Sequence, residues 1–283
     1  MTTVRIVTDS AADLDAETIE RFQISVVPMT VHFGREVYAH SELSNDEFWR
    51  KTAHGPHPGT SQPPIGLFEE AFSSLVDAGH EVLCVTITGR HSGTLSTALA
   101  GARRFGNKVK VIDSRSLSLG QGFQVLVAAR AALEGTGLDQ VARVAEQVRE
   151  RLHLVILLDT IEHVRRGGRA DSLIPILHRV TKILNIKPIL AVAGGQLGLH
   201  GLARSYERGL KQIRRDIAGL GSIEYLAVMH TRCAGTAREL ARTLAQELGF
   251  PEEQIVVTET GPALAVHGGP NVIGVAAVRR ASQ

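Results

Sequence analysis

Short polar turns rich in hydroxyl residues and glycine carry the most evident chemistry in this sequence. The stretch VTITGRHSGTLSTALAGARRF, residues 85–105, runs from an apolar segment through Ser92, Gly93 and Thr94 into an amphipathic pattern. Three functions suit such a turn: a nucleophilic serine, a phosphate loop, or a cradle that binds an anion. A helix that begins at Ser92 favours the anion, because N–H groups at a helix N-terminus are unpaired and carry partial positive charge.

The motifs of the two other functions are incomplete around this turn. A nucleophile elbow has the form Gly-x-Ser-x-Gly, but Arg90 and Thr94 occupy the two glycine positions around Ser92. A phosphate loop has Gly-Lys five residues after its first glycine, and no such pair follows Gly89. The GQG at 120–122 lacks the third glycine of a dinucleotide fingerprint. The turn is therefore expected to bind a ligand rather than to react with it.

Polar turns of the same kind recur along the chain. In an open α/β sheet, ligands bind beyond the carboxyl ends of the strands, where such turns gather. Helix capping is the alternative for each turn alone. Ser92 could cap the helix that follows it, and Thr60 or Ser61 could cap the helix predicted at 65–79. Recurrence at successive strand ends favours a shared site, since capping does not require neighbouring turns to match. The other turns are Thr8-Asp9-Ser10, Thr60-Ser61-Gln62-Pro63 and Asp113-Ser114.

A different turn, VHGGPNVIG, stands near the C-terminus. His267 precedes Gly268 and Gly269 in a predicted tight loop. Glycines let the backbone approach a ligand closely, so this histidine is a candidate hydrogen-bond donor to a carboxylate or phosphate. A purely structural histidine is the alternative. If His267 met Ser92 and Thr60 across a domain cleft, the three side chains would form an anion clamp.

The elements that must position these residues alternate in the first half of the chain. Continuous apolar strands between amphipathic helices predict a mostly parallel α/β sheet covered on both faces. The expected strands are 4–10, 24–33, 81–88 and 109–114, the expected helices are 15–22, 44–53, 65–79, 118–135 and one beginning at residue 92, and a loop is expected at 54–64.

The pattern changes after the amphipathic helix predicted at 138–152. Two strands around a Gly-Gly turn at 187–201 predict a hairpin, and therefore a mixed or antiparallel sheet in a second α/β domain. We expect domains at 1–152 and 153–283, with the ligand site between them. The other expected strands are 152–159, 224–230, 254–260 and 271–278, and the expected helical regions are 161–184, 204–217 and 235–249.

Composition excludes several classes of protein. The 283 residues include 31 basic and 29 acidic side chains, a balance that argues against nucleic-acid binding. No apolar run approaches the roughly 20 residues that cross a bilayer, so no stable membrane insertion is expected. Cys84 and Cys233 lie in apolar stretches and are expected to be free thiols in the cytoplasm. His54 and His57 have no carboxylate cluster beside them, so no metal site is expected.

The polar motifs, taken in order, resemble the DegV family of bacterial fatty-acid-binding proteins, which includes the fatty-acid-binding subunits of fatty acid kinase. The resemblance covers essentially the whole chain and implies a two-domain α/β protein with a long-chain fatty acid in an apolar tunnel. It also implies a non-catalytic subunit without a cofactor, which presents the carboxylate to a separate ATP-dependent kinase for acyl-phosphate formation. The motifs are VTDSAADL, GTSQPP, SGTLSTA, VIDSRSLSLGQG, RRGGR, KPIL and HGGPNVIG.

The resemblance also assigns residues. It implies that Thr60, Ser92 and His267 hold the carboxyl group, and that Arg169 and Arg204 contact the kinase. Residues beside the proposed clamp complete the expected ligand-binding set: Ser61, Gly93, Thr94 and Gly268.

The C-terminal motif departs from the family pattern at two positions. Asn271 stands where many relatives have glycine, and Gly268 where a small hydroxyl residue is common. Two other functions stay open. One is a hydrolase or phosphotransferase acting on a small acid, with Ser92 as nucleophile and His267 as base. The other is a binder of a different amphiphile that works without a kinase.

Overall fold

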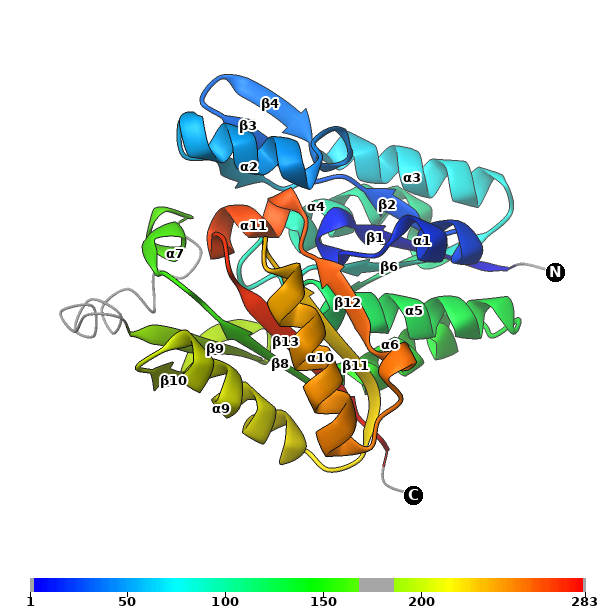
Figure 1. The fold of residues 1–283 in the computed structure, drawn as a ribbon. Helices are drawn as coiled ribbons and strands as arrows, with labels where there is room; N and C mark the ends of the chain where they lie inside the picture. The colour runs from blue at the N-terminus through cyan, green and yellow to red at the C-terminus, as the bar shows by residue number, and fades with distance from the viewer. Residues whose placement is uncertain (1–2, 168–185, 282–283) are drawn as a thin grey trace. The chain divides into compact units, whose positions relative to one another are not determined.

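A computed structural model describes residues 3–167 and 186–281 and divides the chain into two compact units (Figure 1). The first unit comprises Met1–Glu150 together with Gly261–Ala263, and the second comprises Arg151–Thr260 and Leu264–Gln283. The chain is α/β, as predicted, with a parallel sheet in the first unit and a mixed sheet in the second.

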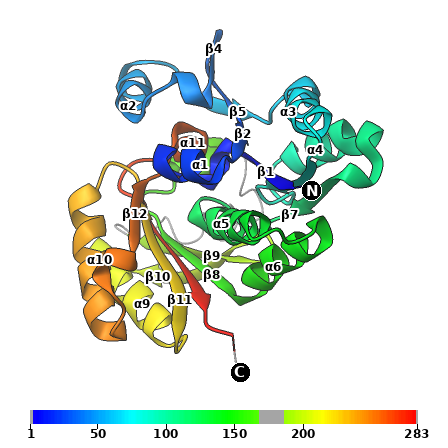
Figure 2. The same cartoon turned by 90° about the vertical axis from the view of Figure 1, so that its right-hand side faces the viewer.

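The first unit is built on a parallel sheet. Apolar, largely β-branched strands are typical of a sheet buried on both faces. Val4, Ile6 and Leu83 pack against α5 (Leu119–Leu133) and α6 (Leu138–Arg151), while Val7 and Cys84 pack against α3 (Ile65–Asp77) and α4 (Thr94–Ala102). Figure 2 shows these two pairs of helices on opposite sides of the sheet. The strands, in spatial order, are β2 (Ser25–Val27), β1 (Val4–Asp9), β6 (Glu81–Thr86) and β7 (Val109–Asp113).

Helices in this unit mostly begin and end at the predicted places. Ser44 caps α2 by accepting a hydrogen bond from the N–H of Glu47, a typical N-cap arrangement. The α-helices are α1 (Ala16–Phe22), α2 (Asn45–His54), α3 (Ile65–Asp77), α4 (Thr94–Ala102), α5 (Leu119–Leu133) and α6 (Leu138–Arg151), and the 3₁₀ segments are η1 (Ser10–Ala12), η2 (His40–Glu42) and η3 (Arg103–Lys108).

A small antiparallel sheet, β4-β3-β5, corrects two predictions. The strand predicted at 24–33 is two strands in different sheets, because Pro28 has no N–H to continue the ladder. The loop predicted at 54–64 contains β5, in which Thr60 pairs with Val31 of β3. The strands are β3 (Thr30–Phe33), β4 (Glu36–Ala39) and β5 (Gly59–Ser61).

The second unit has a six-stranded mixed sheet. The hairpin around the Gly-Gly turn is confirmed: β9 and β10 pair antiparallel. Only β11 and β12 pair in parallel within the described sheet. In spatial order the strands are β10 (Gln196–Ala203), β9 (Lys187–Ala193), β8 (Leu152–Leu157), β13 (Ile273–Arg279), β11 (Ile223–His230) and β12 (Val256–Glu259).

Helices α9 and α10 cover one face of this sheet through an aliphatic core that includes Leu157, Ile213 and Leu244. The predicted helical region 161–184 includes α7, and its remainder lies outside the described residues. Over 3–167 and 186–281, no helix is both long and apolar enough to cross a membrane. The helical segments are α7 (Glu162–Gly167), α9 (Tyr206–Ala218), α10 (Ala234–Leu248), α11 (Pro262–Gly268) and η4 (Glu252–Gln254).

Candidate ligand site

The turn before α4 presents two hydroxyl groups in contact. The Oγ of Ser92 lies 2.8 Å from the Oγ1 of Thr94 and also accepts a hydrogen bond of 3.3 Å from the Thr94 N–H. The N-cap of α4 is Gly93, so the helix begins two residues later than predicted and Ser92 is not its cap. The hydroxyl of Ser92 therefore stands just before the positive end of a helix, where an anion is stabilised.

Gln62 joins this turn to the segment that follows β5. A Cβ atom on Gly93 would lie 2.8 Å from the side-chain carbon, oxygen and nitrogen of the Gln62 amide. The absence of a side chain at Gly93 thus lets the Thr60–Gln62 segment lie against the Ser92–Thr94 turn. The sequence predicts a polar turn that contains Gln62 but assigns this residue no role. The only signal for Gln62 in the sequence is its place in the motif TSQP.

Thr60 and Ser61 were expected at a strand end, with helix capping as the alternative. Both lie within β5, where Thr60 is partly buried and Ser61 is exposed. The N-cap of α3 is Pro64, which has no side-chain cap, so the capping alternative is wrong for both residues.

Asp9 fixes the loop that follows β6. Its carboxylate accepts a hydrogen bond of 2.7 Å from the N–H of Ile87 and another of 3.0 Å from the N–H of Ala11. The side chain is 0% exposed, and burial raises the pKa of Asp9 to about 6. Each carboxylate oxygen of Asp9 therefore holds a backbone N–H group, so this residue of the Thr8-Asp9-Ser10 turn has a structural role.

Asp113 holds the same loop from the end of β7. The N–H of Gly89 is 3.3 Å from both of its carboxylate oxygens, and the N–H of Thr88 donates to the carbonyl of Ser116 at 2.9 Å. Ser114 is buried and donates its hydroxyl to that same carbonyl. The Asp113-Ser114 turn therefore positions the loop that leads to Ser92.

Two buried glutamines of α5 complete this polar scaffold. The amide nitrogen of Gln121 donates to the hydroxyl of Thr8 at 2.9 Å, and that of Gln124 donates to the carbonyl of Ser114 at 2.9 Å. Both side chains are fully buried. These bonds satisfy the two amide nitrogens and hold α5 against the carboxyl ends of the strands, while the buried amide oxygen of each glutamine has no hydrogen-bond partner among the described residues.

A hollow of about 230 Å³ opens beside η1 in the first unit, and both Asp9 and His40 line it. Burial lowers the pKa of His40 to about 4, so its imidazole is neutral near pH 7. The N–H of Gly261 donates to Asp13 at 3.0 Å, and a Cβ atom on Gly261 would lie 2.4 Å from a ring carbon of His40.

His267 lies in α11 rather than in the predicted tight loop, which begins only after Gly268. The loop proper turns at Gly269, whose φ of +77° favours glycine. A Cβ atom there would lie 2.4 Å from the ring of His163, so glycine also makes room for that imidazole. Thr231 fixes the turn by donating its hydroxyl to the Gly269 carbonyl at 2.6 Å.

Asn271, two residues after Gly269, also has a left-handed conformation, with φ of +58°. Its amide nitrogen donates to Asp159 at 3.1 Å, and its carbonyl accepts from the Tyr206 hydroxyl at 2.8 Å. Asp159 also forms an ion pair of 2.6 Å with Lys187. Asn271 therefore adopts a left-handed backbone conformation that favours glycine, and its side chain adds a hydrogen bond to Asp159.

The candidate residues fall in both units. The first unit brings together the β5 segment and the Ser92–Thr94 turn, while His267 and Gly268 belong to the second unit. Arg204 is exposed between β10 and α9, and Arg169 lies outside the described residues. Within 3–167 and 186–281, no group of three or more histidine, cysteine or acidic side chains could hold a metal ion.

Known proteins resemble the chain over its length. A sequence model described as "Uncharacterised protein, DegV family" matches residues 3–280. A DegV domain-containing protein of Clostridium acetobutylicum is 30% identical over 284 residues, which is 96% of each chain. Another from Deinococcus radiodurans is 31% identical over 279 residues, or 96% of this chain and 97% of the relative.

Solved structures share the fold. A DegV family protein from Thermus thermophilus, described by its fatty acid binding, superposes with a TM-score of 0.88 at 27% identity and covers 99% of this chain and 100% of its own. Bacillus subtilis DegV, described as a fatty acid binding protein, has a TM-score of 0.87 at 24% identity with the same coverage. The family model matches nearly all of the sequence, and the fold agrees with solved structures of DegV proteins. The chain therefore belongs to the DegV family.

Proposed function

We propose that the protein binds a long-chain fatty acid in an apolar tunnel and holds the carboxylate through Thr60, Ser92 and His267. The observation that carries the proposal is the likeness, over 99% of the chain, to the Thermus thermophilus protein described by its fatty acid binding. The Ser92–Thr94 turn supports it, because two adjacent hydroxyls before a helix N-terminus suit a carboxylate.

The polar groups and the apolar chain of the ligand have different roles in this proposal. Burial of each CH₂ group contributes about 0.8 kcal/mol, so affinity comes mainly from the alkyl chain. The hydroxyl and imidazole groups offset the cost of burying the carboxylate and fix its orientation.

A binding role fits the contacts of Ser92 better than nucleophilic catalysis does. An activated serine is held by a base within hydrogen-bonding distance. Here the Ser92 hydroxyl contacts the hydroxyl and N–H of Thr94, neither of which is a base. The protein is therefore proposed to be a non-catalytic carrier, which presents the carboxylate to an ATP-dependent fatty acid kinase that Arg204 and Arg169 help to recognise.

Lipid analysis of the purified chain tests the binding proposal. Native mass spectrometry followed by organic extraction should find close to one fatty acid per chain. Ser92→Ala and His267→Ala should each reduce that occupancy because the carboxylate loses a donor. Ser74→Ala, on the exposed surface of α3, removes a hydroxyl elsewhere in the first unit and should leave the occupancy unchanged. A chain that is empty and rejects added fatty acids overturns the proposal and favours an enzyme of small acids.

Phosphoryl transfer tests the finer proposal separately. The loaded chain, incubated with ATP, should yield acyl phosphate only after addition of an ATP-dependent fatty acid kinase. Product formed by the chain alone would make it an enzyme. No product with any such kinase, at full fatty-acid occupancy, would leave the carrier proposal in place but remove the kinase from it.

A further inference from the structure

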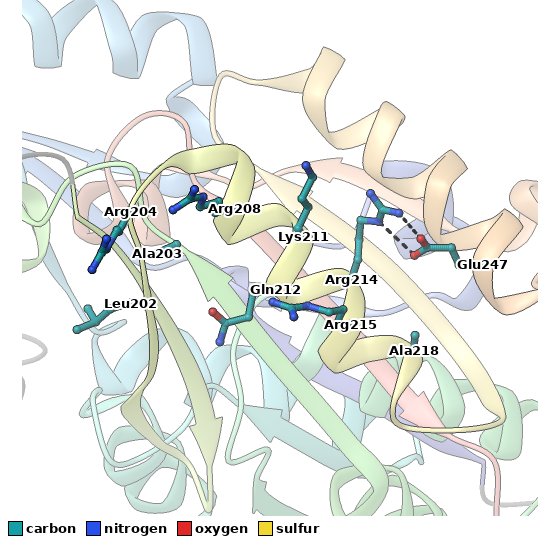
Figure 3. Close-up of a pocket in the computed structure, with 10 residues that line it drawn as sticks. All are labelled: Leu202, Ala203, Arg204, Arg208, Lys211, Gln212, Arg214, Arg215, Ala218 and Glu247. Atoms are coloured by element: carbon teal, nitrogen blue, oxygen red, sulfur yellow. Dashed lines mark hydrogen bonds and ion pairs between the residues drawn. The ribbon is translucent and has the colours of Figure 1, made fainter.

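A groove of about 900 Å³ runs along α9 in the second unit (Figure 3). It begins at the end of β10 and continues over the helix to one residue of α10. Cations dominate its lining, and the lining contains one acidic side chain, Glu247. The basic residues are Arg204, Arg208, Lys211, Arg214 and Arg215.

Helical spacing places several of these cations on one face. Arg208, Lys211 and Arg215 stand at positions i, i+3 and i+7, which share one side of an α-helix. Arg204 stands between the end of β10 and the extended N-cap residue Ser205, so it lies just before α9 and not on the helix itself (Figure 3). Arginine and lysine side chains are donors without acceptors, so the row presents N–H groups only.

The acidic side chains near this row already have partners. Glu247 forms an ion pair with Arg214. Glu207 pairs with Lys211 at 2.8 Å, and Asp216 lies 2.9 Å from a ring nitrogen of His200.

Three arginines of the groove, by contrast, form no ion pair with any described residue: Arg204, Arg208 and Arg215. The carboxylate of Glu207, which is paired with Lys211, also attracts Arg208 electrostatically. The whole chain has a formal net charge of only +2, so this concentration of positive charge is local.

Guanidinium groups bind phosphate oxygens through paired, charge-assisted hydrogen bonds. The groove volume falls within the range of small-molecule sites, about 300–1,000 Å³. Seven residues of helix separate Arg208 from Arg215 by about 10 Å along the axis, which suits an anion long enough to contact guanidinium groups at both ends of the row. We propose that the α9 groove binds a small anion with several linked phosphate groups, in addition to any fatty acid bound elsewhere.

Titration calorimetry with tripolyphosphate tests this site on the full chain. The unaltered protein should bind the probe, and Arg208→Gln combined with Arg215→Gln should weaken binding by at least about tenfold, since each loses charge-assisted bonds. The matched control is Arg238→Gln with Arg242→Gln, which removes the same charge from exposed positions of α10 in the same unit. The control should bind tripolyphosphate like the unaltered protein.

Three results would overturn the proposal: no binding by the unaltered chain, an equal loss in both double variants, or binding to phosphatidylglycerol vesicles without binding to tripolyphosphate. The second result would indicate general electrostatic attraction, and the third a lipid surface. Circular dichroism of each variant shows whether it is folded. Fatty-acid occupancy, measured by extraction, should be equal in all of them, so failure of this site and failure of the proposed function are distinguishable.

Discussion

Gly93 is the residue at which the Ser92 turn and the segment after β5 meet, and it allows a sharp test. In Gly93→Ala, the added Cβ would lie 2.8 Å from the Gln62 amide, which must rotate away. Because a flexible side-chain end can move, we expect a stability loss below about 1 kcal/mol. Fatty-acid occupancy, measured by extraction, should nevertheless fall because the rotated Gln62 amide no longer holds the segment carrying Thr60 against the turn.

A double-mutant cycle identifies the cause of that effect. In a Gln62→Ala background, Gly93→Ala should produce no further loss of fatty acid, since the colliding group has been removed. Gly66→Ala is the control, because a Cβ at Gly66 in α3 meets nothing within 4 Å. Independent, additive losses from the two substitutions would contradict the contact-based explanation.

Asn271 offers a second test at the residue scale. Asn271→Ala keeps the left-handed conformation, which disfavours a Cβ, and loses the hydrogen bond to Asp159, so it should destabilise the chain by about 1–2 kcal/mol. Asn271→Gly loses the same bond but relieves the backbone and should be closer to the unaltered protein. Urea unfolding of both variants measures the order, and a glycine variant less stable than the alanine variant would refute it.

The sequence predicted the types of the site residues better than their roles. Ser92, Thr94 and Thr60 were identified as candidates, and their segments are brought together. Asp9 and Asp113 were interpreted as part of a ligand cradle, yet both bind backbone N–H groups of one loop. A carboxylate after a strand looks the same in sequence whether it faces a ligand or a neighbouring loop, because the N–H groups that it binds are distant in the chain.

The position of helix α5 depends on Gly122, where the backbone of η1 lies close to the helix. In Gly122→Ala, the Cβ would lie 2.9 Å from the backbone carbonyl of Ala12 in η1, which cannot rotate aside. We expect α5 to be displaced and the first unit to lose about 1–3 kcal/mol of stability, as is usual for overpacking. Urea unfolding measures the change, and Gly66→Ala should be neutral or stabilising by up to about 1 kcal/mol. Equal stability of the two variants would show that α5 adapts.

At the element scale, long periodic segments were predictable and short strands were not. The α3 and α10 helices and the β9–β10 hairpin follow from apolar spacing and turn residues within their own segments. The three-residue β5 has no such pattern, and it is a strand because Thr60 and Ser61 pair with β3. His267 was assigned to a loop because two glycines follow it, whereas α11 continues through Gly268 and the left-handed turn comes at Gly269.

At the scale of the whole molecule, Asp9 and His40 should give the first unit opposing pH responses. Folding raises the pKa of Asp9 from 3.8 to about 6, so its contribution is full below pH 3.8 and is lost as the pH rises through 6. Folding lowers the pKa of His40 from 6.5 to about 4, so its contribution is full above pH 6.5 and is lost as the pH falls through 4. Each change amounts to about 3 kcal/mol.

Between about pH 4 and 6 the two slopes therefore nearly cancel. Asp9→Asn should leave a stability that rises with pH in this window, and His40→Gln should leave one that falls. Trp49 in α2 is the chain's one tryptophan, so its fluorescence during urea unfolding reports on the first unit. Parallel pH profiles for the two variants would contradict the assignment of opposite signs.

The return of Gly261–Ala263 to the first unit has a consequence for how the protein is made. The 110 residues from Arg151 to Thr260 separate these three residues from the rest of that unit. At a translation rate of about 5–20 residues per second, Gly261 is synthesised about 5–20 s after Glu150. The hydrogen bond from the Gly261 N–H to Asp13 therefore cannot form until Gly261 has been synthesised. The N-terminal unit is completed only when most of the chain has been translated.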